Sequence, residues 1–278
     1  MPGLFVVLWA SGYVFGKLGL SHAGPATFLF LRFCIVVALM LPVALAMRAD
    51  WPRSWRALGN VAAIGLLMQA CSLGSIFAAI HFGVPAGLAA LIAGAQPLLT
   101  AALVGPLLGE RVTARQWLGF VLGLAGVALV VEHKLSFEGG ETEGFFFCLL
   151  SLASFTLATI YQKKVGGGVD LRSGSVIQFA VSAVVMGLIA VVFEDMRIDW
   201  TAEFIFALGW LCVVLSIGAI TLLFVLIRQG AAGKVASLFY LVPPVTALIA
   251  WPLFGETLGV LGVIGMAVAV VGVALVNR

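Results

Sequence analysis

The stretch QPLLTAALVGPLLGE, from Gln96 to Glu110, returns as VPPVTALIAWPLFGE from Val242 to Glu256. The proline, the Thr-Ala pair, the Pro-Leu pair and the Gly-Glu turn coincide at a constant offset of 146 residues, which carries Glu110 onto Glu256. The same register continues through glycine-rich segments near residues 119–130 and 265–276. The chain therefore contains an internal duplication, a pattern typical of transporters with internal repeats.

Composition places this repeat in a lipid bilayer. The chain has 278 residues, of which 63% are hydrophobic and 10% charged, whereas a soluble domain carries about 25% charged residues. Apolar runs long enough to cross about 30 Å of hydrocarbon follow one another with short connectors. The expected spans are residues 3–20, 25–47, 57–82, 84–108, 114–132, 144–164, 173–193, 203–228, 231–254 and 258–276.

The basic residues are distributed unevenly among the connectors. Arginine and lysine collect after the second, fourth, sixth and eighth spans, whereas the connectors after the fifth and seventh spans are acidic. Because basic connectors stay in the cytoplasm, both termini are predicted to be cytoplasmic. The formal net charge of +3 carries no such information. The four cysteines all fall within apolar spans and indicate no disulfide framework or metal site.

Topology and repeat together predict an inverted architecture. A unit of five spans is odd, so its second copy enters the membrane from the opposite side. The expected fold is an all-α membrane protein of about ten transmembrane helices, arranged as two inverted five-helix repeats around a central cavity. The expected division is repeat 1 at residues 1–132, an external connecting loop at 133–143 and repeat 2 at 144–278.

Several motifs resemble the drug/metabolite transporter superfamily, and more narrowly its ten-helix exporters with two EamA-type domains. They are Phe30-Leu-Arg32-Phe33, the run PAGLAALI from Pro85, Gln96-Pro97 with Thr100, the Gly109-Glu110-Arg111 turn and the glycine-rich fifth span. The resemblance covers nearly the whole chain. It implies an inner-membrane exporter of small metabolites, commonly amino acids. One departure is Thr257, which follows the second Gly-Glu turn where the first has an arginine.

Prolines near the middle of equivalent spans point to the binding site. Pro97 and the pair Pro243-Pro244 each remove a helical hydrogen bond, and irregular backbone at membrane depth is tolerated beside a wet cavity. The alternative is a simple bend. The predicted cavity wall is Trp9, Tyr13, Arg32, Gln69, Ser72, Gln96, Thr100 and Tyr240.

Several of these residues have a competing structural interpretation. Trp9 and Tyr13 share one helix face and either grip an apolar substrate or pack against neighbours. Gln69 and Ser72 form a polar stripe that lines the cavity or bonds another helix. Arg32 either binds a substrate carboxylate or is satisfied within the protein. His81, at the outer end of the third span, is a candidate for an outer gate or a solvated side chain.

The function predicted from these features is export of amino acids, with aromatic or other apolar ones as candidates, by alternating access. Because every acidic residue falls in or beside a connector, facilitated export is favoured over coupling through a buried carboxylate. The alternative is a multidrug, xenobiotic or other metabolite exporter, with proton coupling left open.

Two other classes of membrane protein are disfavoured. An intramembrane enzyme is disfavoured because no histidine lies deep in a span, and a channel is disfavoured because the sequence shows no ring of charged side chains. The expected partners are a small-molecule substrate and the bilayer, without cofactor, metal or nucleic acid. A monomer is the simplest assembly, with an oligomer left open.

Overall fold

A computed structural model describes residues 2–82, 84, 92–109, 111–131, 142–165, 168–229, 235, 237–242, 244–246, 248–249 and 260–277. Helices make up nearly all of this part of the chain. In the first half they are α1 (Pro2–Leu20), α2 (Pro25–Ala46), α3 (Trp55–Gly65), η1 (Leu66–Leu73), α4 (Gly74–His81), α6 (Gln96–Leu108) and α7 (Ala114–Val131). In the second they are α8 (Thr142–Val165), α9 (Leu171–Phe193), α10 (Ala202–Trp210), η4 (Leu211–Ala219), α11 (Ile220–Gln229), η5 (Leu238–Leu241) and α14 (Val260–Asn277).

Six helical segments within these ranges are long and apolar enough to cross a membrane. They comprise α1, α2, α8 and α9, together with the continuous segments Trp55–His81 and Ala202–Gln229. Shorter apolar helices cover Gln96–Gly105 and Val260–Val276. The described part of the chain is thus all-helical, with spans of membrane-crossing length, while the count of ten spans stays a prediction.

Large apolar side chains are exposed on the surface of the bundle, and many polar side chains are buried in its interior. On α9, Val184, Leu188 and Val191 are 62–69% exposed, whereas Ser175, Gln178 and Ser182 on the same helix are buried. A protein in water would show the reverse pattern. Lipid accepts an apolar outer face, and polar side chains are satisfied by facing the bundle interior.

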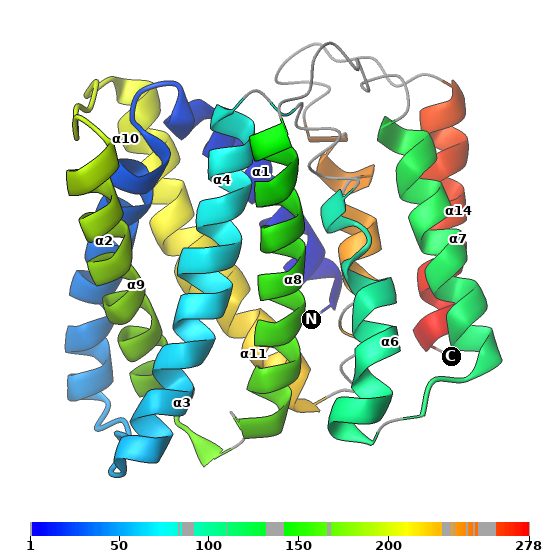
Figure 1. Cartoon of the computed structure of the whole chain (residues 1–278), viewed down its shortest axis with the longest axis horizontal. Helices are drawn as coiled ribbons and strands as arrows, with labels where there is room; N and C mark the ends of the chain where they lie inside the picture. Colours follow the sequence, from blue (N-terminus) through cyan, green and yellow to red (C-terminus); the bar gives the residue numbers. More distant parts are fainter. Residues whose placement is uncertain are drawn as a thin grey trace.

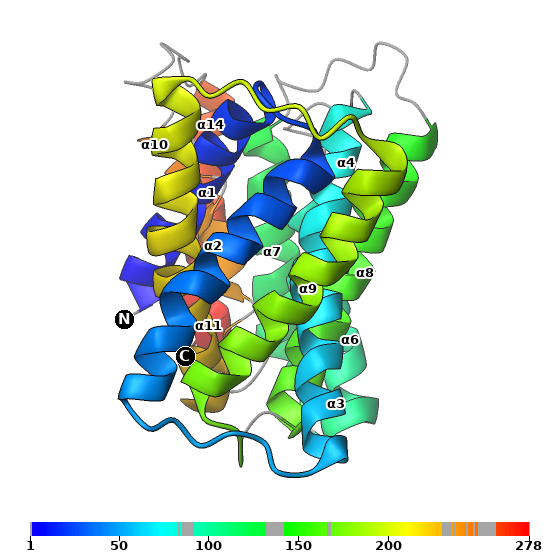
Figure 2. The same cartoon turned by 90° about the vertical axis from the view of Figure 1, so that its left-hand side faces the viewer.

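The helices form one bundle; α2, α8 and α9 extend along most of its length, whereas α4 and α10 lie in its upper part and α3 and α6 in its lower part (Figures 1 and 2). The pair α7 and α14 packs together at one side and the pair α2 and α9 at the other, with α1 and α8 between them (Figure 1). Both ends of the chain lie in the lower half of that view. The connector at residues 47–54 and residues 168–170 also lie at the lower end, and residues 194–201 at the upper end.

The offset of 146 residues reappears in the helix boundaries. It carries α7 (Ala114–Val131) onto α14 (Val260–Asn277) without any shift. The π-helical segment η1 (Leu66–Leu73) falls within one residue of η4 (Leu211–Ala219) in the same way. π-helical segments are rare and often occur at functional sites. Their presence at matching positions in both halves therefore supports the repeat that the sequence indicates.

The helices α7 and α14, which the offset relates, run in opposite directions. A Cβ on Gly119 would lie 2.6 Å from the carbonyl oxygen of Gly272, and one on Gly126 would lie 2.6 Å from that of Gly265. Moving along α7 from Gly119 to Gly126, the contacted residue on α14 moves back from Gly272 to Gly265, so the two helices are antiparallel. The offset relates Gly119 to Gly265 and Gly126 to Gly272, so the two contacts are the same contact made twice, as across a two-fold axis.

Candidate functional site

Four aromatic rings form a cluster where α1, α8 and η5 meet. The half-buried Trp9 has its ring centroid 5.3 Å from that of Phe5, 5.8 Å from that of Phe155 and 5.2 Å from that of Phe239. Phe155 and Phe239 are in turn 5.2 Å apart and perpendicular. Phe239 meets Trp9 and Phe155 edge to face, an arrangement that is favourable for aromatic pairs. We call Phe5, Trp9, Phe155 and Phe239 the aromatic cluster.

Two residue pairs in the bundle contact their own equivalents. The offset relates Trp9 to Phe155, whose rings touch in the aromatic cluster. It also relates Phe33 on α2 to Phe179 on α9, with centroids 5.6 Å apart. A residue that contacts its own copy lies beside the axis relating the copies. The aromatic cluster therefore lies where the halves of the chain meet.

A break in each half reaches this region. In the first half, residues 94–95 form a turn and α6 begins at Gln96, with Pro97 in its first turn. Proline fits there because the first helical N–H groups need no partner within the helix. In the second half, the 3-10 segment η5 covers Leu238–Leu241, the positions equivalent to residues 92–95. A turn at residues 94–95 therefore stands directly before Pro97. Within the expected span at 84–108, residues 92–93 and 96–108 are helical, and residues 85–91 lie outside the described part of the chain.

The two sides of this break hold buried polar groups. Gln96 donates from Nε2 to Oγ1 of Thr100 at 3.0 Å, and both side chains are buried. Oε1 of Gln96 has no hydrogen-bond partner within the described ranges. Thr246, the equivalent of Thr100, donates to the carbonyl oxygen of Ala10 at 3.3 Å, next to Trp9. The first break therefore holds buried polar groups, and in the second half Thr246 bonds the residue that follows Trp9 in α1.

The second proline break is described only in part. Pro243 lies outside the described residues, whereas Pro244 is buried in a helical segment. Tyr240 is fully buried, and its ring occupies the space in which a Cβ on Gly123 of α7 would lie, 2.3 Å from Cδ2. Its hydroxyl has no partner among the residues described. Tyr240 thus packs against α7.

The polar stripe on the third span lies on the π-helical segment η1. Ser72 is buried, and its carbonyl oxygen accepts from Oγ of Ser151 on α8 at 2.8 Å, while the two hydroxyls are 3.3 Å apart. Gln69 is 2% exposed, and its Nε2 lacks a partner in the described part of the chain. Ser72 therefore makes a helix-to-helix bond, whereas Gln69 keeps an unused donor.

Arg32 is buried at 1% exposure between α2 and η4. Its Nε donates to Oγ of Ser216 at 2.9 Å, and its carbonyl oxygen accepts from Sγ of Cys212 at 3.6 Å. Nη1 has no acceptor in the described ranges, where no carboxylate pairs with this guanidinium. A buried cation that lacks a partner is costly. Part of its hydrogen-bonding capacity thus remains for another ligand.

Two predicted residues fall outside this group. His81 is exposed in the last turn of α4, where its ring lies 5.9 Å from that of Phe82. Tyr13 belongs to α1, but its side chain is outside the described part of the structure. Sequence reasoning missed Phe155, Phe239 and Ser151. Applying the offset to Trp9 yields Phe155, so that signal was present in the sequence.

Comparison with known proteins shows which family this chain belongs to. The model of the EamA-like transporter family matches residues 4–132 and again residues 142–278. The chain belongs to the EamA-like transporter family. It is a transporter and not an enzyme, and it is a multi-pass inner-membrane protein.

Relatives of this EamA-like transporter support the same assignment. The "Uncharacterized inner membrane transporter YedA" of Escherichia coli K12 is 28% identical over 98% of this chain and 87% of its own length. A "Probable amino-acid metabolite efflux pump" of Salmonella typhimurium is 29% identical over 92% of this chain and 86% of its own. A "Probable terminal-alkyne amino-acid exporter" of Streptantibioticus cattleyicolor is 27% identical over 99% and 91%.

A crystal structure with 19% sequence identity matches the fold with a TM-score of 0.82. It covers 99% of this chain and 94% of the other. At that identity the match concerns the fold alone.

Proposed function

We propose that this EamA-like transporter exports amino acids, aromatic or other apolar ones among them, by alternating access. The proposed carrier has ten spans in two inverted halves, residues 1–132 and 144–278, joined by an external loop at 133–143, with both termini in the cytoplasm. Two similar relatives named for amino-acid export support the substrate class. Antiparallel packing of equivalent helices supports the inverted arrangement.

The observation that carries the proposal is the contact of Trp9 with its own equivalent, Phe155, inside the aromatic cluster. When two inverted halves rock against each other, positions beside their common axis move least. A substrate bound there keeps its site while access alternates between the two sides. Aromatic rings offer a large apolar surface, which suits the side chain of an apolar amino acid.

In this proposal, Arg32 supplies the positive charge that binds the carboxylate of the amino acid. The segment η4, which holds its Nε through Ser216, packs against both α1 and α2. A substrate carboxylate at Nη1 would complete the hydrogen bonds of the guanidinium, and a charge-assisted bond is stronger than a neutral one. Gln69 and Gln96, each with one unused amide atom, are the neutral polar groups of the proposed cavity.

Facilitated export fits the acidic residues that the structure describes. All of them lie in connectors or in the first turn of a helix, as Glu143 does in α8 and Glu203 in α10. A carrier that couples to protons or sodium commonly holds a carboxylate within the membrane. We therefore propose transport driven by the substrate gradient itself.

Counterflow in liposomes tests this function. Liposomes with purified full-length protein and a preloaded amino acid should accumulate the labelled form of the true substrate, within a panel of amino acids. Trp9→Ala and Phe155→Ala should each lower counterflow about tenfold or more, because each removes a ring from the site. Gln96→Ala and Tyr240→Phe should also reduce it. The matched control is Phe146→Ala, which removes a ring from the same helix as Phe155 at a position that is 60% exposed.

The same assay, with labelled cationic dyes added to the panel, distinguishes an amino-acid exporter from a xenobiotic exporter. An aromatic wall accepts apolar cations as well as amino acids. If labelled cationic dyes exchange and no amino acid does, the carrier is a xenobiotic exporter and the amino-acid proposal fails. Equal losses in Phe146→Ala and Phe155→Ala would remove the aromatic cluster from the mechanism.

A further inference from the structure

The helices α2 and α9, which the offset relates, contact each other at both ends and in the middle. At the upper end of the bundle in Figure 2, the carboxylate of Glu194 accepts from the N–H groups of Ala26 and Thr27, both at 2.8 Å. Next to it, the N–H of Asp199 donates to the carbonyl oxygen of His22 at 2.9 Å. We call these contacts the outer clasp, because the charge pattern of the sequence predicts that this end faces outward.

The opposite end of the same pair carries equivalent contacts. Ser173, the equivalent of Thr27, donates from Oγ to the carbonyl oxygen of Asp50 at 2.6 Å, just as the hydroxyl of Thr27 donates in the outer clasp at 2.6 Å. Arg172 donates from Nη1 to the carbonyl oxygen of Met47 at 3.2 Å. We call these contacts the inner clasp. Each clasp thus joins the start of one helix of the pair to the connector that follows the other.

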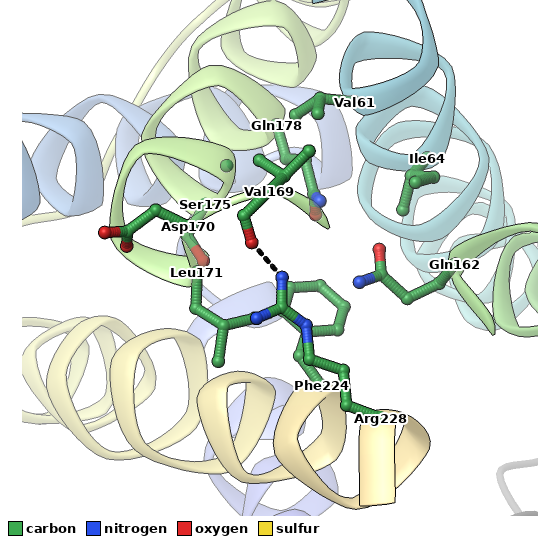
Figure 3. A pocket seen from close by; sticks show the side chains of 11 residues that line it. Val61, Ile64, Gln162, Val169, Asp170, Leu171, Ser175, Gln178, Phe224 and Arg228 are labelled. Atoms are coloured by element: carbon green, nitrogen blue, oxygen red, sulfur yellow. Dashed lines mark hydrogen bonds between the residues drawn. The ribbon is translucent and has the colours of Figure 1, made fainter. Parts of the chain in front are cut away.

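The inner clasp is also fixed within the second half of the chain. Arg228 of α11 donates from Nη2 to the carbonyl oxygen of Val169, directly before the N-cap of α9 (Figure 3). The N-cap itself, Asp170, accepts from the N–H of Arg172 at 2.8 Å. The start of α9 is therefore held by its own half while it holds the connector after α2. Because of this, α2 cannot move away from α9 at this end without breaking the inner clasp.

Between the two clasps, the helices pack closely. The equivalent rings of Phe33 and Phe179 are fully buried, with centroids 5.6 Å apart, and a Cβ on Gly187 of α9 would lie 2.9 Å from the ring of Phe30 on α2. The first N–H groups of a helix have no partner within it, so opening the outer clasp would take the acceptor from donors at the start of α2. In alternating access the two ends of a gate open in turn, whereas this pair is closed along its whole length.

We propose that α2 and α9 move as one unit and keep both clasps closed while access alternates. Access then changes by movement of the other helices relative to this pair, which lies at one side of the bundle (Figure 1). The substrate never passes between α2 and α9. This inference rests on the proposed alternating access and names a part of the interface between the halves that does not open.

A disulfide across the outer clasp tests this in the full-length carrier, with its four native cysteines replaced by alanine. Ala23 and Ile198 form an antiparallel bridge, in which the Cα atoms are about 4.5–5.5 Å apart, a separation that a disulfide spans. Counterflow of the labelled substrate that the panel identifies is measured in liposomes before oxidation, after it and after reduction. Oxidation of the variant Ala23→Cys with Ile198→Cys should leave the rate unchanged.

A cross-link across the inner clasp completes the test. Met47→Cys and Arg172→Cys are joined by a membrane-permeant bifunctional thiol reagent about as long as the arginine side chain that it replaces, since that side chain reaches the backbone of Met47. Counterflow should again be unchanged, also when both ends are cross-linked in one protein. The matched controls are the single-cysteine variants, treated with the same oxidant or reagent.

The possible outcomes separate this inference from the proposed function. Loss of counterflow on cross-linking either clasp, restored by reduction at the outer one, would identify that clasp as a gate and overturn the inference alone. Failure of the outer pair to form a disulfide would overturn it too. His22→Cys with Asp199→Cys, one residue further along the same pairing, replaces the outer pair if that variant does not fold. If the wild type exchanged no substrate, the proposed function would fail, and this inference with it.

Discussion

Single residues at the ends of α2 and α9 show how the two halves are joined. Gly24, the N-cap of α2, has no side chain to cap the helix, and Glu194 at the end of α9 takes its place. Its carboxylate accepts from the backbone N–H groups of Ala26 and Thr27, both at 2.8 Å, and from Oγ1 of Thr27 at 2.6 Å. A Cβ on Gly24 would lie 2.4 Å from Oε2 of Glu194. Glycine is therefore required there for the cap to fit.

Glu194→Ala should lower stability by about 1–2 kcal/mol, the usual cost of losing an N-cap. The reason is that three donors at the start of α2 lose their acceptor together. The measurement is the midpoint of thermal unfolding in detergent, followed by circular dichroism. Asp195→Ala, which removes the neighbouring exposed acid, is the control, and equal midpoints for the two variants would contradict the capping role.

Asp170 is the equivalent of Gly24 and caps α9 with its own side chain, which accepts from the N–H of Arg172 at 2.8 Å. The hydrogen bonds from the Arg172 side chain, above all, lower the pKa of Asp170 to about 2. Because the folded pKa lies below the unfolded value of about 4, the stabilisation is present above pH 4. It is lost as the pH falls toward 2.

Asp170→Asn should therefore be less stable than wild type at neutral pH, and the difference should shrink as the pH falls from about 4 to about 2. Asparagine still caps the helix, so the variant isolates the charge. Unfolding midpoints across this range provide the measurement. The same substitution in an Arg172→Gln background should show a weaker pH dependence, and a gap that stays constant in both backgrounds would refute the assignment.

Among the elements, the pair α7 and α14 depends on glycine. A Cβ on Gly272 would lie 2.6 Å from both the carbonyl oxygen of Gly119 and the amide nitrogen of Gly123. Small residues let helix backbones approach closely in lipid, where van der Waals packing replaces the hydrophobic effect. The repeated glycines of the sequence thus explain why two copies of one helix pack against each other.

Gly119→Val and Gly272→Val should each destabilise the protein by about 1–3 kcal/mol, as overpacking does, because the backbones cannot separate without losing their contacts. Gly209→Val is the control, since nothing lies within 4 Å of its Cβ position. Thermal unfolding midpoints of the three purified variants test this. The α7–α14 contact would be dispensable if Gly209→Val lowered the midpoint as much as the others.

For the whole molecule, the inverted arrangement makes a prediction about sidedness. Glu110 and Glu256 are equivalent under the offset and lie outside the described residues. Single cysteines at these positions, in a chain whose four native cysteines are replaced by alanine, should react with a membrane-impermeant maleimide from opposite faces. Glu110→Cys should be labelled from the cytoplasm and Glu256→Cys from outside. Labelling of both from one face would refute the inverted repeat.

The carrier as a whole should respond to the substrate gradient and not to pH. Counterflow in liposomes should keep the same rate when a proton gradient of either direction is imposed, because the described acidic residues lie at helix ends and in connectors. The measurement is initial uptake with and without the gradient, with substrate concentrations held equal. Acceleration by an opposing proton gradient would establish coupled antiport instead.

Sequence alone was sufficient for the class of fold and for the family. Apolar spans of bilayer length and the offset of 146 residues are local or linear properties, and most expected spans agree with the described helices to within about two residues. Boundaries such as residues 114–131 follow directly from hydropathy. Trp9, Gln96 and Arg32 could be named from the sequence as candidates for the proposed cavity, because aromatic and polar residues in an apolar chain, and residues beside a proline, are easily recognised.

Tertiary structure decided what these residues contact. The meeting of Trp9 with Phe155, the pairing of Arg32 with Ser216 and the cap that Glu194 gives to α2 join residues far apart in the chain. In lipid, hydropathy fixes that a segment spans the membrane, but its rotation and neighbours depend on side-chain packing and interhelical hydrogen bonds. Those interactions exist only once the helices have assembled, and for that reason no linear pattern revealed them.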